Sequence, residues 1–498
     1  MIISRATRDT TQGRKSNQSR PMRSYSYISP TRLSSLFTPA LTSLSLLIGT
    51  ASAQVVLPPG SLASPIGIIA DHHDKLWISE SGDGTGTTGQ VSRYHPATGI
   101  LQVELSGFPS ELHEGQPTGV HHLAWDPSNV HALNIAMGGT NGHLQTWDVS
   151  TGTLMPGQDF DIRSYSLAQG LPTGAGQPDS NIYSVAVDAA GDHYVVDAGA
   201  NAIIKVDTTG VMSIFAQFPN FPVLGPPFVG QQAVPTKILW DGAGGFWVCN
   251  LTGGPFFAGV ASVFHVDSAG AVVPIQTGFT TLVDMAIDPT DGNLVVLSWG
   301  QFDLNNGFLP FTGTITKLTS TGPQAIASGL MLPTGMAYTS NGDLYVHSYA
   351  LGSLEKIPSA NANSYGTGCG SPALVMTPTG MPAIGGMASA AIQNAPGPQT
   401  IGAVALGYSN TTSMGGSSLP MDLTSLGMPG CHLLQSGEAL GLALTPNLGT
   451  VLQFGIAIPN DTLLLGLHFY TQAYCFAPGQ NAFAVIVSNG VDWIVGHP

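Results

Sequence analysis

The segment YSVAVDAAGDHYVVD, residues 183–197, contains the pattern that decides the fold. Bulky and small side chains alternate up to Asp188, as they do in a strand with two different faces. A Gly-containing turn follows, and a second stretch rich in aromatic and β-branched residues runs from His193 to Asp197. Two such strands joined by a short turn predict one antiparallel hairpin.

The same hairpin pattern occurs six times along the chain. The first strand of each unit ends at residue 71, 126, 188, 241, 288 or 339, so successive units are 47 to 62 residues apart. A third strand follows in most units, and a fourth in some. Repeats of this length with several strands each are typical of propeller blades. We therefore predict an all-β chain with a six-bladed β-propeller over residues 54–358.

The ends of the repeat region predict how the ring closes. The last unit stops after residues 353–357 and has no fourth strand of its own, whereas the strand-like QVVL of residues 54–57 precedes the first unit. Pairing of these two segments would complete the last blade and cover its open edge.

The first 53 residues have the pattern of a secretory signal. Arg32 precedes an apolar run at 36–48, and the small residues ASA at 51–53 form a cleavage pattern. Met22 is an alternative start. The run is too short to span a membrane, and no second apolar stretch is long enough. We expect a secreted, periplasmic or cell-surface protein with no transmembrane span.

The charge balance argues against nucleic-acid partners. The chain has 498 residues with 14 basic and 29 acidic side chains, and only 9% of its residues are charged. Seven of the basic residues lie in the first 53 positions, which leaves 7 against 28 acidic residues in the remainder, and none lies beyond residue 359. Such an acidic surface repels phosphate backbones and anionic lipid.

A second domain is expected at the C-terminus. Residues 359–370 are predicted to be a linker, and residues 371–498 a β-sandwich of about eight short strands separated by turn residues, one of them over residues 463–470. Of the four cysteines, Cys249 is expected to be a buried small hydrophobe. A Cys369–Cys431 disulfide is favoured, with pairings to Cys475 left open. The chain has no C-x-x-C motif, so a structural zinc site is not supported.

Short motifs in the propeller region resemble the ScyD/ScyE family, whose blades are of the NHL type. They are SESG at 79–82, VDAGANAI at 196–203, VPT at 234–236, LTGGPF at 251–256 and GFT at 278–280. The tail, with YGTGC at 365–369, MPGC at 428–431, GLHFYTQ at 466–472 and VSNG at 487–490, resembles a C-terminal β domain of secreted planctomycete-type proteins. These resemblances imply a secreted propeller without a defined reaction and an accessory tail.

Candidate functional residues lie near the start of the innermost strands, which converge on the propeller channel. The channel candidates are His121, His122, Tyr183, Thr236, Asp284 and Thr334. Neighbouring residues of a strand point to opposite faces, so one of the two histidines is expected to face the channel, with Asp284 or Glu80 as its partner. The aromatic loops offer a second set, because exposed aromatic clusters often mark interfaces: Phe221, Phe228, Phe256, Phe257, Phe308 and Phe311.

Two functions follow from these residues. The first is a non-catalytic binding or scaffolding module that presents its loops to an extracellular protein, glycan or small ligand, without a cofactor. The second is a metal-assisted lyase or hydrolase, by analogy with streptogramin-lyase and SMP-30 lactonase propellers, in which a divalent cation would be held in the channel. The second requires a channel histidine and Asp284 to converge around an open metal position.

Overall fold

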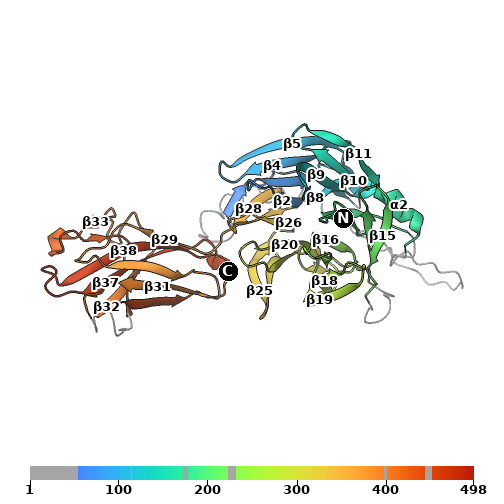
Figure 1. Cartoon of the computed structure of the whole chain (residues 1–498). Coiled ribbons are helices and arrows are strands. Elements are labelled where there is room, and N and C mark those ends of the chain that lie inside the picture. Colours follow the sequence, from blue (N-terminus) through green and yellow to red (C-terminus); the bar gives the residue numbers. More distant parts are fainter. Residues whose placement is uncertain are drawn as a thin grey trace, which may run out of the picture.

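The computed structural model describes residues 54–497 except 114, 172–177, 222–230, 398–400 and 444–450. The predicted signal, the alternative start at Met22 and Phe228 lie outside the described residues. Nearly all of the described chain is strand, turn or loop (Figure 1). No helix within these ranges is long and apolar enough to cross a membrane.

Six four-stranded antiparallel sheets make up the described part of residues 54–357. The first three contain, from the innermost strand outward, β2 (Pro65–Ala70), β3 (Leu76–Glu80), β4 (Gly89–His95) and β5 (Ile100–Phe108); β8 (Val120–Asp126), β9 (Asn129–Met137), β10 (His143–Asp148) and β11 (Thr153–Asp161); and β12 (Ile182–Val187), β13 (His193–Asp197), β14 (Ala202–Val206) and β15 (Met212–Gln217).

The other three sheets follow the same order from inside to outside. They contain β16 (Pro235–Trp240), β17 (Phe246–Asn250), β18 (Ala261–Val266) and β19 (Val272–Phe279); β20 (Leu282–Ile287), β21 (Leu294–Ser298), β24 (Gly313–Thr319) and β25 (Gly322–Leu330); and β26 (Pro333–Tyr338), β27 (Leu344–Ser348), β28 (Ser353–Ile357) and β1 (Gln54–Leu57).

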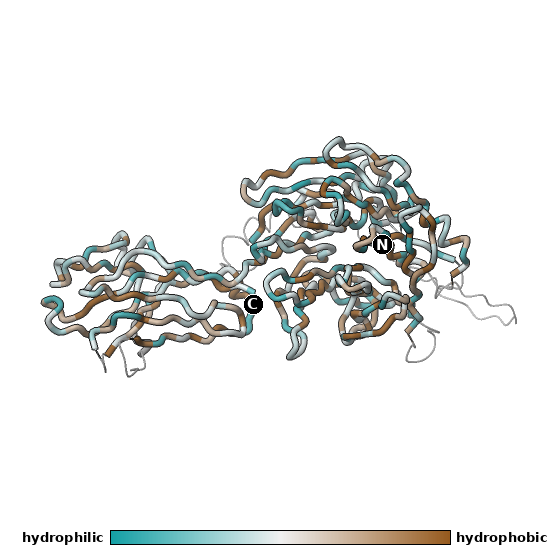
Figure 2. The backbone as a smooth tube through the Cα atoms, in the orientation of Figure 1, coloured by the Kyte–Doolittle hydropathy of each residue, from teal (hydrophilic) through white to brown (hydrophobic). Residues whose placement is uncertain are grey.

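The innermost strands form a closed ring. Each of β2, β8, β12, β16 and β20 contacts the innermost strand of the next sheet, and β26 contacts β2 again. Burial follows this arrangement: all six residues of β12 are buried, whereas the outer strand β19 is mostly exposed. Figure 2 shows hydrophobic segments within the sheets and more hydrophilic ones at many turns. The predicted propeller fold is thus observed.

The predicted closure by the N-terminal strand is confirmed. β1 pairs antiparallel with β28, with Val55 opposite Glu355 and Leu57 opposite Leu354. Leu57 and Leu354 are buried in one cluster with Leu76 of the first sheet. The strand therefore covers the outer edge of the last sheet and contributes apolar surface to the contact with its neighbour.

The remaining elements of this region lie in the connections between strands. They are the hairpin β6 (Glu111–His113) and β7 (Gln116–Thr118), the 3-10 turn η1 (Gly139–Asn141), the helix α2 (Ile162–Gln169) and the hairpin β22 (Phe302–Asp303) and β23 (Gly307–Phe308). Asp161 caps α2 by accepting a hydrogen bond from the Ser164 backbone N–H, as an N-cap aspartate does. The aromatic loop that contains the candidates Phe308 and Phe311 thus includes a small hairpin.

The C-terminal domain consists of two packed sheets, as predicted. The larger has the order β29 (Asn361–Tyr365), β38 (Val485–Ile494), β37 (His468–Phe476), β32 (Gly402–Gly407) and β35 (Ala439–Ala443), and the smaller β30 (Val375–Gly380), β31 (Met387–Gln393) and β36 (Leu452–Ala457). Trp493 of β38 is fully buried and stacks on Phe469 of β37 at a centroid distance of 6.0 Å. Phe454 of β36 reaches the same tryptophan from the smaller sheet.

Three short elements complete this domain: the strands β33 (Met421–Asp422) and β34 (His432–Leu433) with the 3-10 turn η2 (Thr424–Leu426) between them, and the 3-10 turn η3 (Thr462–Leu464). The favoured disulfide is present between Cys369 and Cys431, with their Cα atoms 5.1 Å apart. Cys249 and Cys475 are free and buried.

Two expectations for this region differ from the structure. Residues 361–365, expected to lie in a linker, form β29, because their backbone pairs with residues 490–494 of β38 as the edge of the larger sheet. The strand expected at 463–470 begins only at His468, because Asp461 caps a 3-10 turn before it through the Leu463 N–H. In the second case, a polar turn-forming side chain, Asp461, thus shortened the strand that the apolar pattern alone predicted.

Candidate functional site

Every innermost strand has a β-bulge near its start. The register of the innermost and second strands shifts within residues 65–68, 120–123, 182–184, 235–238, 282–284 and 333–335. A bulge bends the strand and changes the direction of the side chains around it. The channel candidates predicted from the repeats all lie at this level of the ring.

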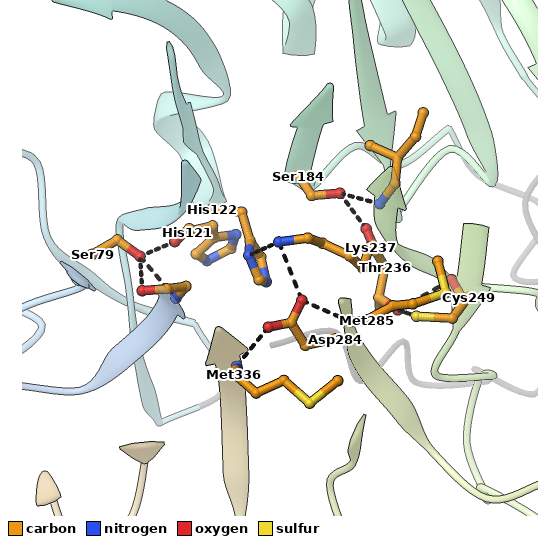
Figure 3. A network of polar contacts seen from close by, with 12 residues as sticks. Ser79, His121, His122, Ser184, Thr236, Lys237, Cys249, Asp284, Met285 and Met336 are labelled. Carbon is orange, nitrogen blue, oxygen red and sulfur yellow. Dashed lines mark hydrogen bonds and ion pairs between the residues drawn. The ribbon is translucent and has the colours of Figure 1, made fainter. Parts of the chain in front are cut away.

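His122, Lys237 and Asp284 meet in the centre of the ring, although they come from β8, β16 and β20 (Figure 3). Lys237 Nζ lies 3.2 Å from Asp284 Oδ1 and 3.3 Å from His122 Nδ1. Asp284 also accepts hydrogen bonds from the backbone N–H groups of Met285 and Met336, at 2.8 and 2.7 Å. The ammonium group thus bridges the two side chains that the metal hypothesis requires.

Burial determines the protonation of this cluster. Asp284 is fully buried, and burial raises its pKa, while Lys237 and the two backbone donors act in the opposite direction. Burial and the charge of Lys237 hold the pKa of His122 well below its usual range, so this ring is neutral. Because an ammonium group has no acceptor, His122 Nδ1 must accept from Lys237, and the ring proton is on Nε2.

Two polar atoms near this cluster are buried without a hydrogen-bond partner among the described residues. They are His122 Nε2 and the Tyr183 hydroxyl, and the rings of these residues lie 5.0 Å apart. Burial raises the pKa of Tyr183 well above its usual range, so the phenol keeps its proton. Both atoms are then neutral donors in a region closed to solvent.

The other channel candidates connect neighbouring sheets instead of facing a common site. The innermost strands of different sheets do not pair, so their buried backbone groups need other partners. His121 Nδ1 lies 2.7 Å from the Ile182 carbonyl oxygen, and its Nε2 lies 2.8 Å from Thr118 Oγ1. Both ring nitrogens are therefore used, and burial lowers the pKa of His121 to about 3.

These connections continue around the ring as a closed series, which we call the inter-sheet belt. One side chain bonds to the backbone of the next sheet at each of the six boundaries: Ser79 to the His121 carbonyl, His121 to the Ile182 carbonyl, Ser184 to the Thr236 carbonyl, Thr236 to the Leu282 carbonyl, Asp284 to the Met336 N–H, and Thr334 to the Pro65 carbonyl. Four of the six channel candidates are thus explained by satisfaction of buried backbone groups.

Sequence reasoning missed two residues of the channel and misjudged a third. Lys237 occupies the same position in its repeat as His122 and Asp284, so alignment of the repeats was the signal for it. His347 of β27 lies 3.3 Å from Thr334 Oγ1 through Nδ1, and burial lowers its pKa to about 3. Glu80 does not approach the histidines: it accepts hydrogen bonds from the Ala63 N–H at 2.6 Å and from Gln90 Nε2 at 2.9 Å.

The arrangement of His122, Lys237 and Asp284 does not suit the binding of a divalent cation between them. The Lys237 ammonium occupies the position that His122 Nδ1 and Asp284 Oδ1 face, and its charge opposes a second cation there. Over the described residues, no group of three or more His, Cys, Asp or Glu side chains is arranged to hold a metal ion.

The aromatic loop candidates divide into buried and exposed residues. Phe256 is buried and lies 4.9 Å from Phe308 and 5.1 Å from Phe302 between ring centroids. Phe257 and Phe311 remain 39% and 60% exposed. Phe221 is half-buried against Phe264 in the described part of its loop.

A solvent-open pocket of about 300 Å³ lies between two of these loops. It is lined by residues 255–258, which follow β17, and residues 302–305, which follow β21. Both loops join the second strand of a sheet to its third, so they lie at the same end of the ring as the starts of the innermost strands. The pocket includes Phe257 but none of the channel candidates.

Comparisons with known proteins return solved structures only. No protein-family model matches the chain, and no curated protein matches it in sequence. Virginiamycin B lyase from Staphylococcus aureus is 13% identical, with a TM-score of 0.40 over 61% of this chain and 84% of that chain. A Bacteroides thetaiotaomicron protein of unknown function is 13% identical, with a TM-score of 0.42 over 62% and 74% of the two chains. A streptogramin B lyase structure is 13% identical, with a TM-score of 0.38 over 61% and 95% of the two chains. At these values the similarities carry no argument about activity, and the fold assignment rests on the sheet topology.

Proposed function

We propose that this chain is a secreted binding module of the ScyD/ScyE type, without catalytic activity, that contacts its ligand through the loop-lined end of the propeller. The observation that carries the proposal is the contrast between two regions. The polar channel residues are closed to solvent, and all of them except Tyr183 bond to one another or to neighbouring sheets. The pocket at 255–258 and 302–305 is open and places Phe257 at its surface.

The alternative is a metal-assisted lyase or hydrolase in the channel. The convergence of His122 and Asp284 favours it, since these two side chains reach one point from different sheets. It requires Lys237 to leave that point or to lose its proton before a cation binds. Separation of Lys237 from Asp284 would leave an unpaired buried charge, which is strongly unfavourable, so the binding module is the better-supported function.

The test begins with metal content. The full chain is expressed in a secretory host, the exported product is purified without added metal or chelator, and bound metals are measured by elemental analysis. We expect much less than one divalent ion per chain. A stoichiometric ion that is lost in Asp284→Asn but retained in the control Asp303→Asn would overturn the proposal in favour of the enzyme.

The second part tests binding directly. The exported protein is applied to arrays of extracellular polysaccharides, basic and acidic peptides and small amines. We expect at least one class to bind, with a loss of tenfold or more in affinity for Phe257→Ala and no change for Val55→Thr, an exposed position on β1. Binding that is insensitive to Phe257→Ala would contradict the assignment of the loop end.

A further inference from the structure

The pocket between the two loops combines fixed aromatic rings with one carboxylate. Phe256, Phe302 and Phe308 contact one another at centroid distances of 4.9 to 5.1 Å, and Trp299 lies 3.9 Å from Phe308. These contacts hold the orientations of Phe256 and Phe302, the two of these rings that line the pocket, before any ligand arrives. Preorganised aromatic faces attract alkylammonium groups through the ring quadrupole.

Among the described residues that line this pocket, Asp303 is the only one with a titratable side chain. Its Oδ1 accepts hydrogen bonds from the Asn305 N–H, the Asn306 N–H and Asn306 Nδ2, at 2.9, 2.9 and 2.8 Å. All three bonds go to the same oxygen and close the turn of the β22–β23 hairpin. The carboxylate is thus held in place at the pocket wall, with its negative charge beside the aromatic rings.

The charge of the whole molecule favours the same kind of ligand. Seven basic residues face 28 acidic ones from residue 54 onward. Five of those seven form ion pairs in the structure, which neutralises most of the positive charge locally: Arg93, Lys205, Lys237, Lys317 and Lys356. The unbalanced carboxylates leave a negative potential that attracts cations and repels anions.

From these observations we infer that the pocket binds a small alkylammonium compound, with the cationic head between Phe257 and Phe302 and next to Asp303. A volume of about 300 Å³ is at the lower end of small-molecule sites and accommodates a trimethylammonium head with a short chain. The inference rests on the proposed binding function and specifies the ligand class for it.

Calorimetric titration of the full exported chain tests the inference with choline and with 3,3-dimethylbutan-1-ol, its uncharged isostere. We expect choline to bind at least tenfold more tightly than the alcohol, and more weakly as salt is raised. Asp303→Asn keeps an acceptor for the hairpin turn and should weaken choline binding about fivefold to tenfold. Phe257→Ala should weaken the binding of both compounds, and the exposed control Val55→Thr on β1 should weaken neither.

The outcomes separate the two proposals. Equal binding of choline and the alcohol, or unchanged binding in Asp303→Asn, would overturn the cationic ligand class and leave an apolar binding site. Absence of choline binding at tens of millimolar would also overturn the inference, while Phe257-dependent binding on the arrays would still support the proposed function. Tighter binding of a trimethyllysine peptide than of choline would show that the head group is recognised on a polypeptide instead of a free amine.

Discussion

At the residue scale, Lys237 and Asp284 form a buried ion pair in the centre of the propeller. Their side chains are 6% and 0% exposed, and the two backbone donors of Met285 and Met336 complete the environment of the carboxylate. Removal of one partner from such a pair leaves an uncompensated charge, whereas removal of both charges does not. Removal of one partner is therefore expected to lower the free energy of unfolding more than removal of both charges.

A double-mutant cycle measures this pair. Lys237→Met should lower the free energy of unfolding by about 3–5 kcal/mol, because Asp284 remains buried without its counter-charge. The double variant with Asp284→Asn should lose clearly less than the sum of the two single variants. Urea denaturation followed by tryptophan fluorescence gives the four values, and strictly additive losses would contradict a direct interaction between the two side chains.

Glu355 provides a pH-dependent prediction. It lies on β28 between Val55 and Val346, and burial raises its pKa from 4.5 to about 6. A raised folded-state pKa means that the folded chain prefers the protonated acid, so stability declines as pH rises from about 4.5 to about 6 and stays reduced above it.

Glu355→Gln should therefore raise the free energy of unfolding by up to about 2 kcal/mol at pH 8 and change it little at pH 4. Thermal melts of both proteins at the two pH values measure the effect. Glu104→Gln is the control, because Glu104 is partly exposed and pairs with Arg93 at 2.6 Å. An equal gain for Glu355→Gln at both pH values would show that titration of the carboxyl is not the cause.

At the element scale, β1 determines whether the last sheet has an open edge. The strand is only four residues long, yet Leu57 is 7% exposed and packs with Leu62, Leu76 and Leu354. Short closing strands of this kind contribute both hydrogen bonds and apolar burial at the junction of first and last sheets.

Leu57→Ala should lower the free energy of unfolding by about 2–4 kcal/mol, in the range of buried leucine truncations. Val55→Ala, on the same strand but 54% exposed, should cost less than about 0.5 kcal/mol. Deletion of residues 54–57 should additionally promote self-association through the uncovered β28 edge, which size-exclusion chromatography detects. Equal effects of the two point substitutions would contradict the role of Leu57 in closing the ring.

At the scale of the whole molecule, the propeller and the C-terminal domain lie side by side and touch (Figure 1). Ser328 Oγ of β25 lies 2.8 Å from Thr462 Oγ1 of η3, and the Tyr338 and His497 rings are 5.8 Å apart. The backbone of His497 also bonds to that of Pro358 and Ala360, so the end of the chain returns to the junction of the two domains.

The disulfide belongs to this scale because it joins residues 62 positions apart. Removal of a disulfide that closes a loop of that length should lower the free energy of unfolding by about 4 kcal/mol. The variant Cys369→Ser with Cys431→Ser should therefore show a lower calorimetric transition for the C-terminal domain, with the propeller transition nearly unchanged. A shift of both transitions by the same amount would indicate that the two domains unfold as one unit.

The free thiols serve as the control for that experiment. Burial raises the pKa of Cys249 to about 12 and that of Cys475 to about 11, so neither thiol is reactive in the native protein. Alkylation should modify none of the four cysteines before unfolding and two after it. Modification in the native state would place one of these side chains nearer the surface than the structure does.

The strands of the repeats were predictable because their pattern is local. The closing strand was predictable because the last unit lacks a fourth strand and residues 54–57 can supply it, although Gln54 pairs with the distant Lys356. A strand, a turn and a second strand are specified by neighbouring residues, and the same sequence pattern occurs in all six units. The aspartates that end the first strands behave likewise: Asp188 Oδ1 accepts from the N–H groups of Ala190 and Asp192, within its own turn.

The channel and the pocket were only partly predictable, since their contacts join residues far apart in sequence. The repeats showed that His122 and Asp284 occupy equivalent positions, but they did not predict that Lys237 contacts both side chains. Phe256 and Phe257 are adjacent and chemically identical, yet one is buried and the other exposed. That difference depends on the neighbouring loop at 302–308, which no local pattern reveals.

The sequence by itself determined that this protein is built of strands and that its repeats form a propeller closed by an N-terminal strand. It favoured a disulfide between Cys369 and Cys431 but left pairings with Cys475 open. Only the tertiary structure decided which polar side chains bond across sheets, that Lys237 neutralises Asp284, and which phenylalanines remain at the surface. The reason is physical: hydrogen-bonding between adjacent strands follows from local periodicity, whereas contacts across the ring depend on the bulges and curvature that bring six separate strands to one centre.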